Sequence, residues 1–81
     1  MKIFGHPKVN DSVSPIELNE VSIVAEPDVL RSIAVFLNTC ADELDSSTGN
    51  TWDHEHWKDN NRNGSQGPDI VIVHPRLLRG P

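Results

Sequence analysis

An apolar repeat between residues 27 and 45 sets the strongest limit on how this 81-residue chain folds. Pro27 and Asp28 suit a first helical turn, because proline is tolerated there and an acid favours the positive end of the helix dipole. Val29 and Phe36 widen the apolar face. Turn-forming residues follow at 45–50. The repeat predicts one amphipathic helix at about 27–45, with the i, i+3, i+4, i+7 spacing at Leu30, Ile33, Ala34, Leu37, Cys40, Ala41 and Leu44.

Four strands are expected around this helix. Val21, Ile23 and Ala25 alternate with other residues at strand period, and 70–73 is a continuous β-branched run typical of a sheet centre. The strands are expected at 2–4, 17–25, 51–57 and 69–73. We therefore predict an α+β fold of order β-β-α-β-β, in which the helix packs on one face of a mostly antiparallel four-stranded sheet. Residues 1–75 would form a single domain and 76–81 a short C-terminal tail.

The last predicted strand is apolar on both faces, and one helix covers only one of them. Trp52, Trp57, the long loops, a second copy of the chain or a different protein could cover the other face. We therefore expect a homodimer or an obligate partner surface. We also expect one of the two tryptophans to be buried.

Size and composition exclude several classes of protein. A chain this short buries only about 60% of its unfolded surface, so its stability is marginal. Cys40 is the only cysteine, which excludes an internal disulfide and fits a reducing compartment. No run approaches the roughly 20 apolar residues of a membrane span, and residues 1–7 lack the apolar core of a signal peptide. The net charge of −5 argues against nucleic-acid binding. We expect a cytoplasmic protein with no membrane partner.

The negative charge is concentrated in the middle of the chain. Nine acids lie between Glu17 and Glu55, against one base, Arg31. This stretch either meets a basic partner or is a solvated surface. Three of the acids lie at the negative end of the helix dipole, where carboxylates are unfavourable: Asp42, Glu43 and Asp45. They either contact a basic partner or are neutralised within the fold by Lys58, Arg62 or Arg76.

The segment Asp53-His54-Glu55-His56 is the densest cluster of chemically active side chains. In a strand, Trp52, His54 and His56 share one face, and this His-x-His spacing can chelate Zn²⁺. A further ligand would have to come from His74, His6, Asp53 or Cys40. The alternative is that both histidines make ordinary structural hydrogen bonds.

Catalytic motifs are lacking. The sequence has no glycine-rich phosphate loop and no nucleophile elbow. Cys40 lies on the apolar face of the predicted helix, where it suits a core residue better than a nucleophile. Glu55 and His56 are the only sensible acid–base pair. We expect no enzymatic activity and no required cofactor.

Four segments carry a resemblance to a known family. They are 21–27, the helix with 40–43, His54-Glu55-His56, and 67–73, which begins Gly-Pro-Asp. Together they resemble the Immunity protein 32 family over roughly residues 17–74. The resemblance implies an α+β fold and a small bacterial protein that neutralises a polymorphic toxin by binding it. It also implies that His54, Glu55, His56 and Asp69 are positions to test.

The leading prediction is a non-enzymatic binding protein that blocks a basic protein toxin through charge complementarity. The predicted partner-binding residues are Asp42, Glu43, Asp45, Trp52, Asp53, Glu55 and Trp57. The alternative is a small structural or regulatory domain that binds zinc through His54 and His56. A small hydrolase or transferase using Glu55 and His56 is the third hypothesis.

Overall fold

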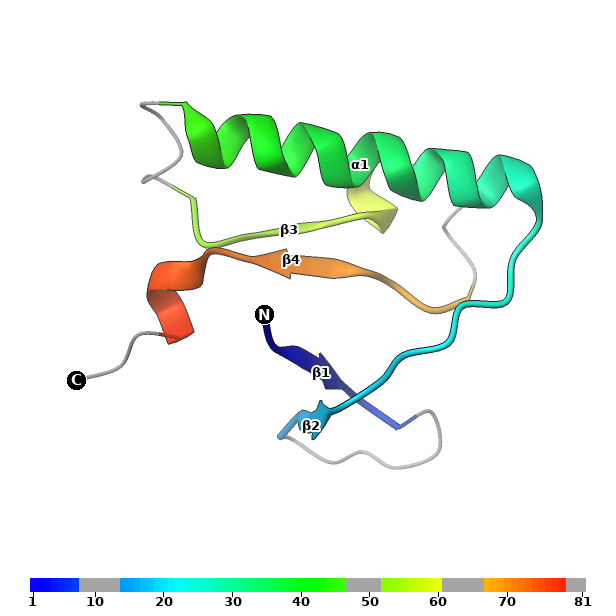
Figure 1. The fold of residues 1–81 in the computed structure, drawn as a ribbon, viewed down its shortest axis with the longest axis horizontal. Coiled ribbons are helices and arrows are strands. Elements are labelled where there is room, and N and C mark those ends of the chain that lie inside the picture. The colour runs from blue at the N-terminus through cyan, green and yellow to red at the C-terminus, as the bar shows by residue number, and fades with distance from the viewer. Residues whose placement is uncertain (8–13, 47–51, 61–66, 79–81) are drawn as a thin grey trace.

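The computed structural model describes residues 1–7, 14–46, 52–60 and 67–78. Its regular elements follow the predicted order β-β-α-β-β (Figure 1). The strands are β1 (Ile3–Gly5), β2 (Ile16–Leu18), β3 (His54–His56) and β4 (Val71–Val73), and the helix between β2 and β3 is α1 (Pro27–Asp45). Short 3₁₀ helices occupy Lys58–Asn60 and Pro75–Leu78, the second of which spans the point where we expected the C-terminal tail to begin.

Helix α1 has the bounds that the sequence predicts. Pro27 occupies its first turn, and Ser46 caps its end by donating its backbone N–H to the carbonyls of Asp42 and Glu43, at 3.1 and 3.3 Å. The Ser46 hydroxyl donates a further hydrogen bond to the Glu43 carbonyl at 2.8 Å. These bonds satisfy carbonyl groups that the last helical turn leaves without partners. Proline therefore marks the start of the helix, and capping by Ser46 accounts for its end.

The strands form two separate two-stranded sheets, so the prediction of a single four-stranded sheet is wrong. In the first sheet β1 pairs antiparallel with β2, and Phe4 lies opposite Glu17. In the second sheet β3 pairs antiparallel with β4, and Glu55 lies opposite Ile72. Each sheet therefore joins neighbouring strands of the predicted order, and no ladder joins the two sheets among the described residues.

The strand predicted at 17–25 is also wrong over most of its length. The pairing with β1 ends at Leu18, and residues 21–26 are neither strand nor helix. Val21, Ile23 and Val24 are at least half exposed, at 53, 52 and 98%. Their alternation would form a strand only against a partner strand, because the strand conformation is stabilised by cross-strand pairing. No described strand lies in register with them.

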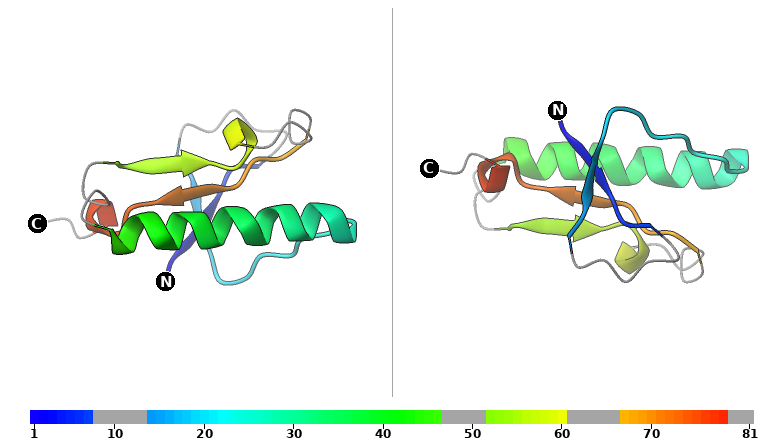
Figure 2. Two further views of the ribbon diagram at one scale, coloured as in Figure 1. Left: turned by 90° about the horizontal axis from the view of Figure 1, so that it is seen from above. Right: turned by 90° about the horizontal axis from the view of Figure 1, so that it is seen from below.

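The three parts of the fold lie in layers. Figure 1 shows α1 on one side of the β3–β4 hairpin and the β1–β2 hairpin on the other. Figure 2 shows β1 and β2 crossing β4 at a steep angle, and α1 lying alongside β4 on the side away from β3. β1 and β2 thus face the surface of the β3–β4 hairpin that points away from α1. They leave Val71 and Val73 of that surface 41 and 43% exposed.

The described core is small and lies between α1 and the β3–β4 hairpin. No described side chain is less than 2% exposed. Cys40 is the most buried, at 3%, which confirms it as a core residue. Trp57 is buried, as expected for one of the two tryptophans. The core consists of Ile33, Phe36, Cys40 and Trp57, with Val29, Ile70 and Ile72 packed against it.

Within residues 1–7, 14–46, 52–60 and 67–78, no helix combines the length and the apolar character that a membrane span requires.

Candidate functional site: a groove between α1 and β3

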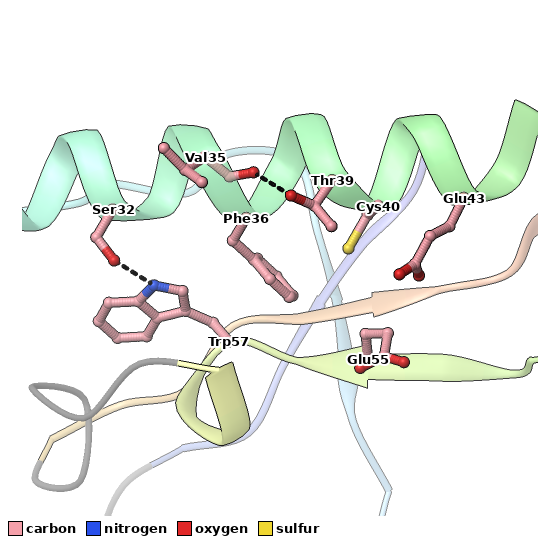
Figure 3. Close-up of a pocket in the computed structure, with 8 residues that line it drawn as sticks. All are labelled: Ser32, Val35, Phe36, Thr39, Cys40, Glu43, Glu55 and Trp57. Atoms are coloured by element: carbon pink, nitrogen blue, oxygen red, sulfur yellow. Dashed lines mark hydrogen bonds between the residues drawn. The ribbon is translucent and has the colours of Figure 1, made fainter.

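A groove runs between the underside of α1 and strand β3. Ser32, Val35 and Thr39 directly precede the core positions Ile33, Phe36 and Cys40, so helical geometry places them together on the flank of α1 that faces β3. The space beneath this flank has a volume of about 550 Å³. We call it the α1–β3 groove, and it is lined by Ser32, Val35, Phe36, Thr39, Cys40, Glu43, Glu55 and Trp57 (Figure 3).

Trp57 forms one end of the groove and is held there by two hydrogen bonds. Its backbone N–H donates to the carbonyl of Ile70 at 2.8 Å, which extends the β3–β4 ladder by one pair. Its indole Nε1–H donates to the hydroxyl of Ser32 at 3.2 Å, as the dashed line in Figure 3 shows. Because Trp57 is bound to both α1 and β4, its ring is a fixed apolar wall beside Phe36.

Two carboxylates face the same space from different elements. Glu43 extends from α1 and Glu55 from β3, and both line the same groove as Cys40 (Figure 3). Burial raises the pKa of the Cys40 thiol, and the charges of Glu43 and Glu55 raise it further. The thiol therefore stays protonated at neutral pH, which disfavours a nucleophilic role. The described lining of the groove holds these two acids and no basic side chain.

Asp69 holds β3 and β4 together beside the groove. Its Oδ2 accepts a hydrogen bond from Nδ1–H of His56 at 2.6 Å. Its Oδ1 accepts the backbone N–H groups of Lys58 at 3.0 Å and Ile70 at 2.8 Å. Burial raises the pKa of the Asp69 carboxyl, but these hydrogen bonds outweigh burial, so the net pKa lies below its ordinary value. Asp69 is thus an ionised structural residue that fixes the start of β4 against the end of β3.

The remaining predicted partner-binding residues lie outside the groove. Asp42 and Asp45 are exposed at the end of α1. Asp53 forms an ion pair with the guanidinium of Arg76, beyond the opposite end of β3 from Trp57. The structure therefore brings together Glu43, Glu55 and Trp57 of the predicted set, and leaves Asp42, Asp45 and Asp53 exposed.

Trp52 packs edge-on against the ring of His74, with ring centroids 5.8 Å apart. His74 is buried, and its Nδ1 accepts the backbone N–H of Arg76 at 3.1 Å. The indole N–H of Trp52 is buried, and none of the described residues accepts a hydrogen bond from it. Trp52 is therefore part of a small aromatic cluster at the end of β3.

Among the described residues, no ion pair joins Asp42, Glu43 or Asp45 to a basic side chain. The two ion pairs there join His56 to Asp69 and Arg76 to Asp53. Arg62, a predicted neutralising residue, lies outside the described part of the chain. Asp42 and Asp45 are exposed, and Glu43 is half-buried in the lining of the groove.

The two histidines of β3 share one face, as predicted. Their ring centroids are 5.1 Å apart and the rings meet edge to face at 73°. Nδ1 of His56 is engaged by the carboxylate of Asp69. No group of three metal-ligating side chains occurs within the described ranges. A zinc site at His54 and His56 stays a prediction.

Sequence reasoning missed Ser32, Val35, Phe36 and Thr39 as groove residues. Ser32 and Thr39 are polar positions of an amphipathic helix, which usually face solvent. The available signal is their spacing. Ser32, Val35 and Thr39 repeat at i, i+3 and i+7, so they form a continuous row along one flank.

Comparison with known proteins gives no relative for this chain. No protein-family model matches it, no curated protein matches it and no solved structure matches it. The resemblance to the Immunity protein 32 family therefore stays a prediction.

Proposed function

We propose that this chain is a non-enzymatic inhibitor that binds a basic protein toxin and places a cationic side chain of that toxin in the α1–β3 groove. The observation that carries the proposal is the convergence of Glu43 and Glu55 on one groove, which is also lined by the aromatic rings of Phe36 and Trp57. Both acids come from the acidic stretch, but they lie on different elements. Only the fold brings the two charges together.

The groove suits a lysine or arginine side chain. Such a side chain has an apolar stem and a charged end, and it is stabilised when the stem packs on apolar surface while the charge meets a carboxylate. Phe36 and Trp57 provide the apolar surface, and aromatic faces also attract cations. The net charge of −5 would steer a basic partner towards this protein and increase its association rate.

The proposal agrees with the resemblance stated above, which implies neutralisation of a toxin by direct binding. It also agrees with the protonated Cys40 thiol, because a binding groove needs no nucleophile. Glu55 belongs both to the groove and to the His-Glu-His segment that carries the resemblance. Asp42 and Asp45 would add contacts at the rim, since both are exposed at the same end of α1 as Glu43.

The first experiment isolates the partner and then measures inhibition with purified components. The protein is used as bait in extracts of its source cells, and the recovered partner is purified and assayed for its own activity. The wild-type chain is compared with Glu43→Lys/Glu55→Lys. The matched control is Glu17→Lys/Glu20→Lys, which changes the net charge equally at exposed residues outside the groove.

We expect the wild type to abolish the partner's activity at equal molar amounts. The groove variant should weaken binding by about 2 kcal/mol or more, which is roughly 30-fold in Kd. The control should change Kd much less, because it alters only the long-range charge. Equal loss in both variants, or a captured partner whose activity is unaffected by the protein, would contradict the proposal.

The second candidate function is metal binding by His54 and His56. The observation that favours it is the hydrogen bond that Nδ1–H of His56 donates to Asp69, since a carboxylate behind an imidazole is typical of metal ligands. This function predicts bound zinc in untagged protein, and a melting temperature that falls on chelation in the wild type but not in His54→Ala. Protein that contains no metal and melts unchanged with chelator would exclude it.

A further inference from the structure

The α1–β3 groove is longer than a single side chain requires. Its lining on α1 extends from Ser32 to Glu43, which at 1.5 Å of rise per residue is about 16 Å. An extended peptide advances about 3.3 Å per residue, so roughly five residues span the same length. The groove thus has room for a short stretch of partner backbone in addition to the cationic side chain proposed for it.

The two ends of the groove differ in chemistry. Figure 3 shows Trp57 beneath Ser32 at one end, and Glu43 above Glu55 at the other. The lining between them includes Val35, an apolar residue that is 66% exposed. A ligand that fills the whole groove therefore meets an apolar wall at one end and two carboxylates at the other.

Strand β3 sets the distance between these two ends. Trp57 and Glu55 are two residues apart in an extended segment, so their side chains point to the same face and lie about 7 Å apart along the strand. An extended segment that runs beside β3 has the same period. Its side chains at positions two apart would therefore lie beside Glu55 and Trp57, as cross-strand neighbours do in a sheet.

The edge of β3 opposite β4 is available for such a segment among the described residues. The N–H of Trp57 donates to the carbonyl of Ile70, and the carbonyl of Asp53 accepts the N–H of His74. Backbone groups of an antiparallel strand point to its two sides in alternation, so those of His54 point away from β4. No described strand pairs with this edge. An extended peptide can add to an edge of this kind, with the main chain giving affinity and alternate side chains giving specificity.

We propose that the α1–β3 groove binds an extended segment of the partner as an added strand along β3, and that this segment carries a basic and an apolar residue two positions apart. The basic residue would lie beside Glu55 and Glu43, and the apolar residue beside Trp57 and Val35. Charge complementarity selects this occupant, because the described lining holds two acids and no basic side chain. The inference rests on the proposed function, since it names the part of the basic partner that the groove recognises.

The first test measures whether the groove reads this spacing. The probes are short synthetic peptides with blocked ends and one composition, in which a leucine and an arginine stand one, two or three positions apart in either order. Binding to the wild-type protein is followed by NMR, from the assigned indole N–H signal of Trp57. We expect a spacing of two to bind about tenfold more tightly than the other spacings in at least one order, because only an even spacing directs both side chains to one face.

A second test exchanges the charge of the groove. Glu43→Lys/Glu55→Lys should lose the preference for the arginine peptide and should prefer the peptide of the same spacing in which glutamate replaces arginine. The matched control, Glu17→Lys/Glu20→Lys, makes the same change of net charge outside the groove and should keep the preference of the wild type. Circular dichroism checks that both variants keep their helix.

Three results would overturn the strand-addition proposal. They are equal binding at every spacing, no binding of any of these peptides up to millimolar concentration, and a preference that the charge exchange leaves unchanged. Each is read from peptides alone, whereas the proposed inhibitory function is judged by neutralisation of the captured partner. Failure of this inference is therefore distinguishable from failure of the proposed function.

Discussion

The two flanks of α1 differ in chemistry although one helical repeat produces both. The flank towards β3 carries Ser32, Thr39 and Glu43, and it closes over a groove that holds a second acid. The flank away from β3 carries only leucine and alanine, and the described chain leaves it exposed. A helix that looks simply amphipathic in sequence therefore has three functions in the fold. It packs the core, lines a polar groove and presents an apolar surface.

This difference teaches where to look for partners on a domain with a small core. The groove offers charge within an apolar frame, which suits a specific basic partner. The flank away from β3, with Leu30, Ala34, Leu37 and Ala41, offers exposed apolar area without charge. The two surfaces lie on opposite sides of one helix, so substitutions can test them separately.

The largest expected effect is a difference in stability between substitutions at Trp57, in the groove wall, and at Leu37, on the opposite flank of α1. Trp57→Ala should destabilise the fold by about 3–5 kcal/mol, because it removes a large buried side chain and leaves a cavity. That loss is comparable to the whole stability of a domain this small, so the variant should be largely unfolded. Leu37→Ala should cost less than about 1 kcal/mol, since Leu37 is exposed. Urea denaturation measures the free energy of unfolding of both variants, and similar losses would contradict the expected difference.

An intermediate effect is expected at Asp69, whose hydrogen bonds hold the start of β4 against the end of β3. Asp69→Asn should destabilise the protein by about 1.5 kcal/mol at neutral pH, because it removes charge-assisted hydrogen bonds. Asp59→Asn, at an exposed carboxylate of the following 3₁₀ helix, is the control and should have little effect.

The pH dependence of the same variant has a definite sign. The pKa of Asp69 is lowered in the folded protein, so its stabilisation is present above the unfolded value of 3.8 and is lost as the pH falls through the folded pKa. The stability difference between the wild type and Asp69→Asn should therefore shrink towards zero in strong acid. A difference that is constant with pH would show that Asp69 acts by some means other than its charge.

The smallest expected effect tests whether the two acids share one space with Cys40. Glu43→Gln/Glu55→Gln should lower the pKa of the Cys40 thiol, because both carboxylates raise it. The rate of alkylation by iodoacetamide at fixed, mildly alkaline pH should then rise a few-fold. Glu17→Gln/Glu20→Gln removes the same charge outside the groove and should leave the rate unchanged. Equal rates in all three proteins would contradict the groove geometry.

The helix was predictable because its signals are local. Proline at its first turn, the apolar repeat and the turn residues after Leu44 all act within a few residues of one another. The class α+β and the element order follow from such local signals as well. The arrangement of the strands does not, since pairing joins residues that are far apart in sequence. Val21 and Ile23 alternate like a strand, yet none of the described strands pairs with them.

The candidate site was predictable in part for the same reason. Glu43, Glu55 and Trp57 were identified as partner-binding candidates by residue type and charge, but only the fold shows that they share one space. Ser32 and Thr39 were missed because a polar residue on a helix normally faces water. Their role depends on β3 lying beneath that flank, which is a tertiary fact. Asp69 became a position to test through the resemblance, and the structure gives it a physical reason as the tie between β3 and β4.

The β1–β2 hairpin contributes no residue to the described core, which lies wholly within α1 and the β3–β4 hairpin. Cooperative unfolding requires shared burial, so the chain should not open as a single unit. We expect amide hydrogen exchange to show two groups of backbone amides that differ in their exchange rates. The protons of β1 and β2 would exchange through a frequent local opening, while those of α1, β3 and β4 wait for global unfolding. Strands β1 and β2 would then behave as an adjustable appendage, whose rearrangement leaves α1 and the β3–β4 hairpin intact.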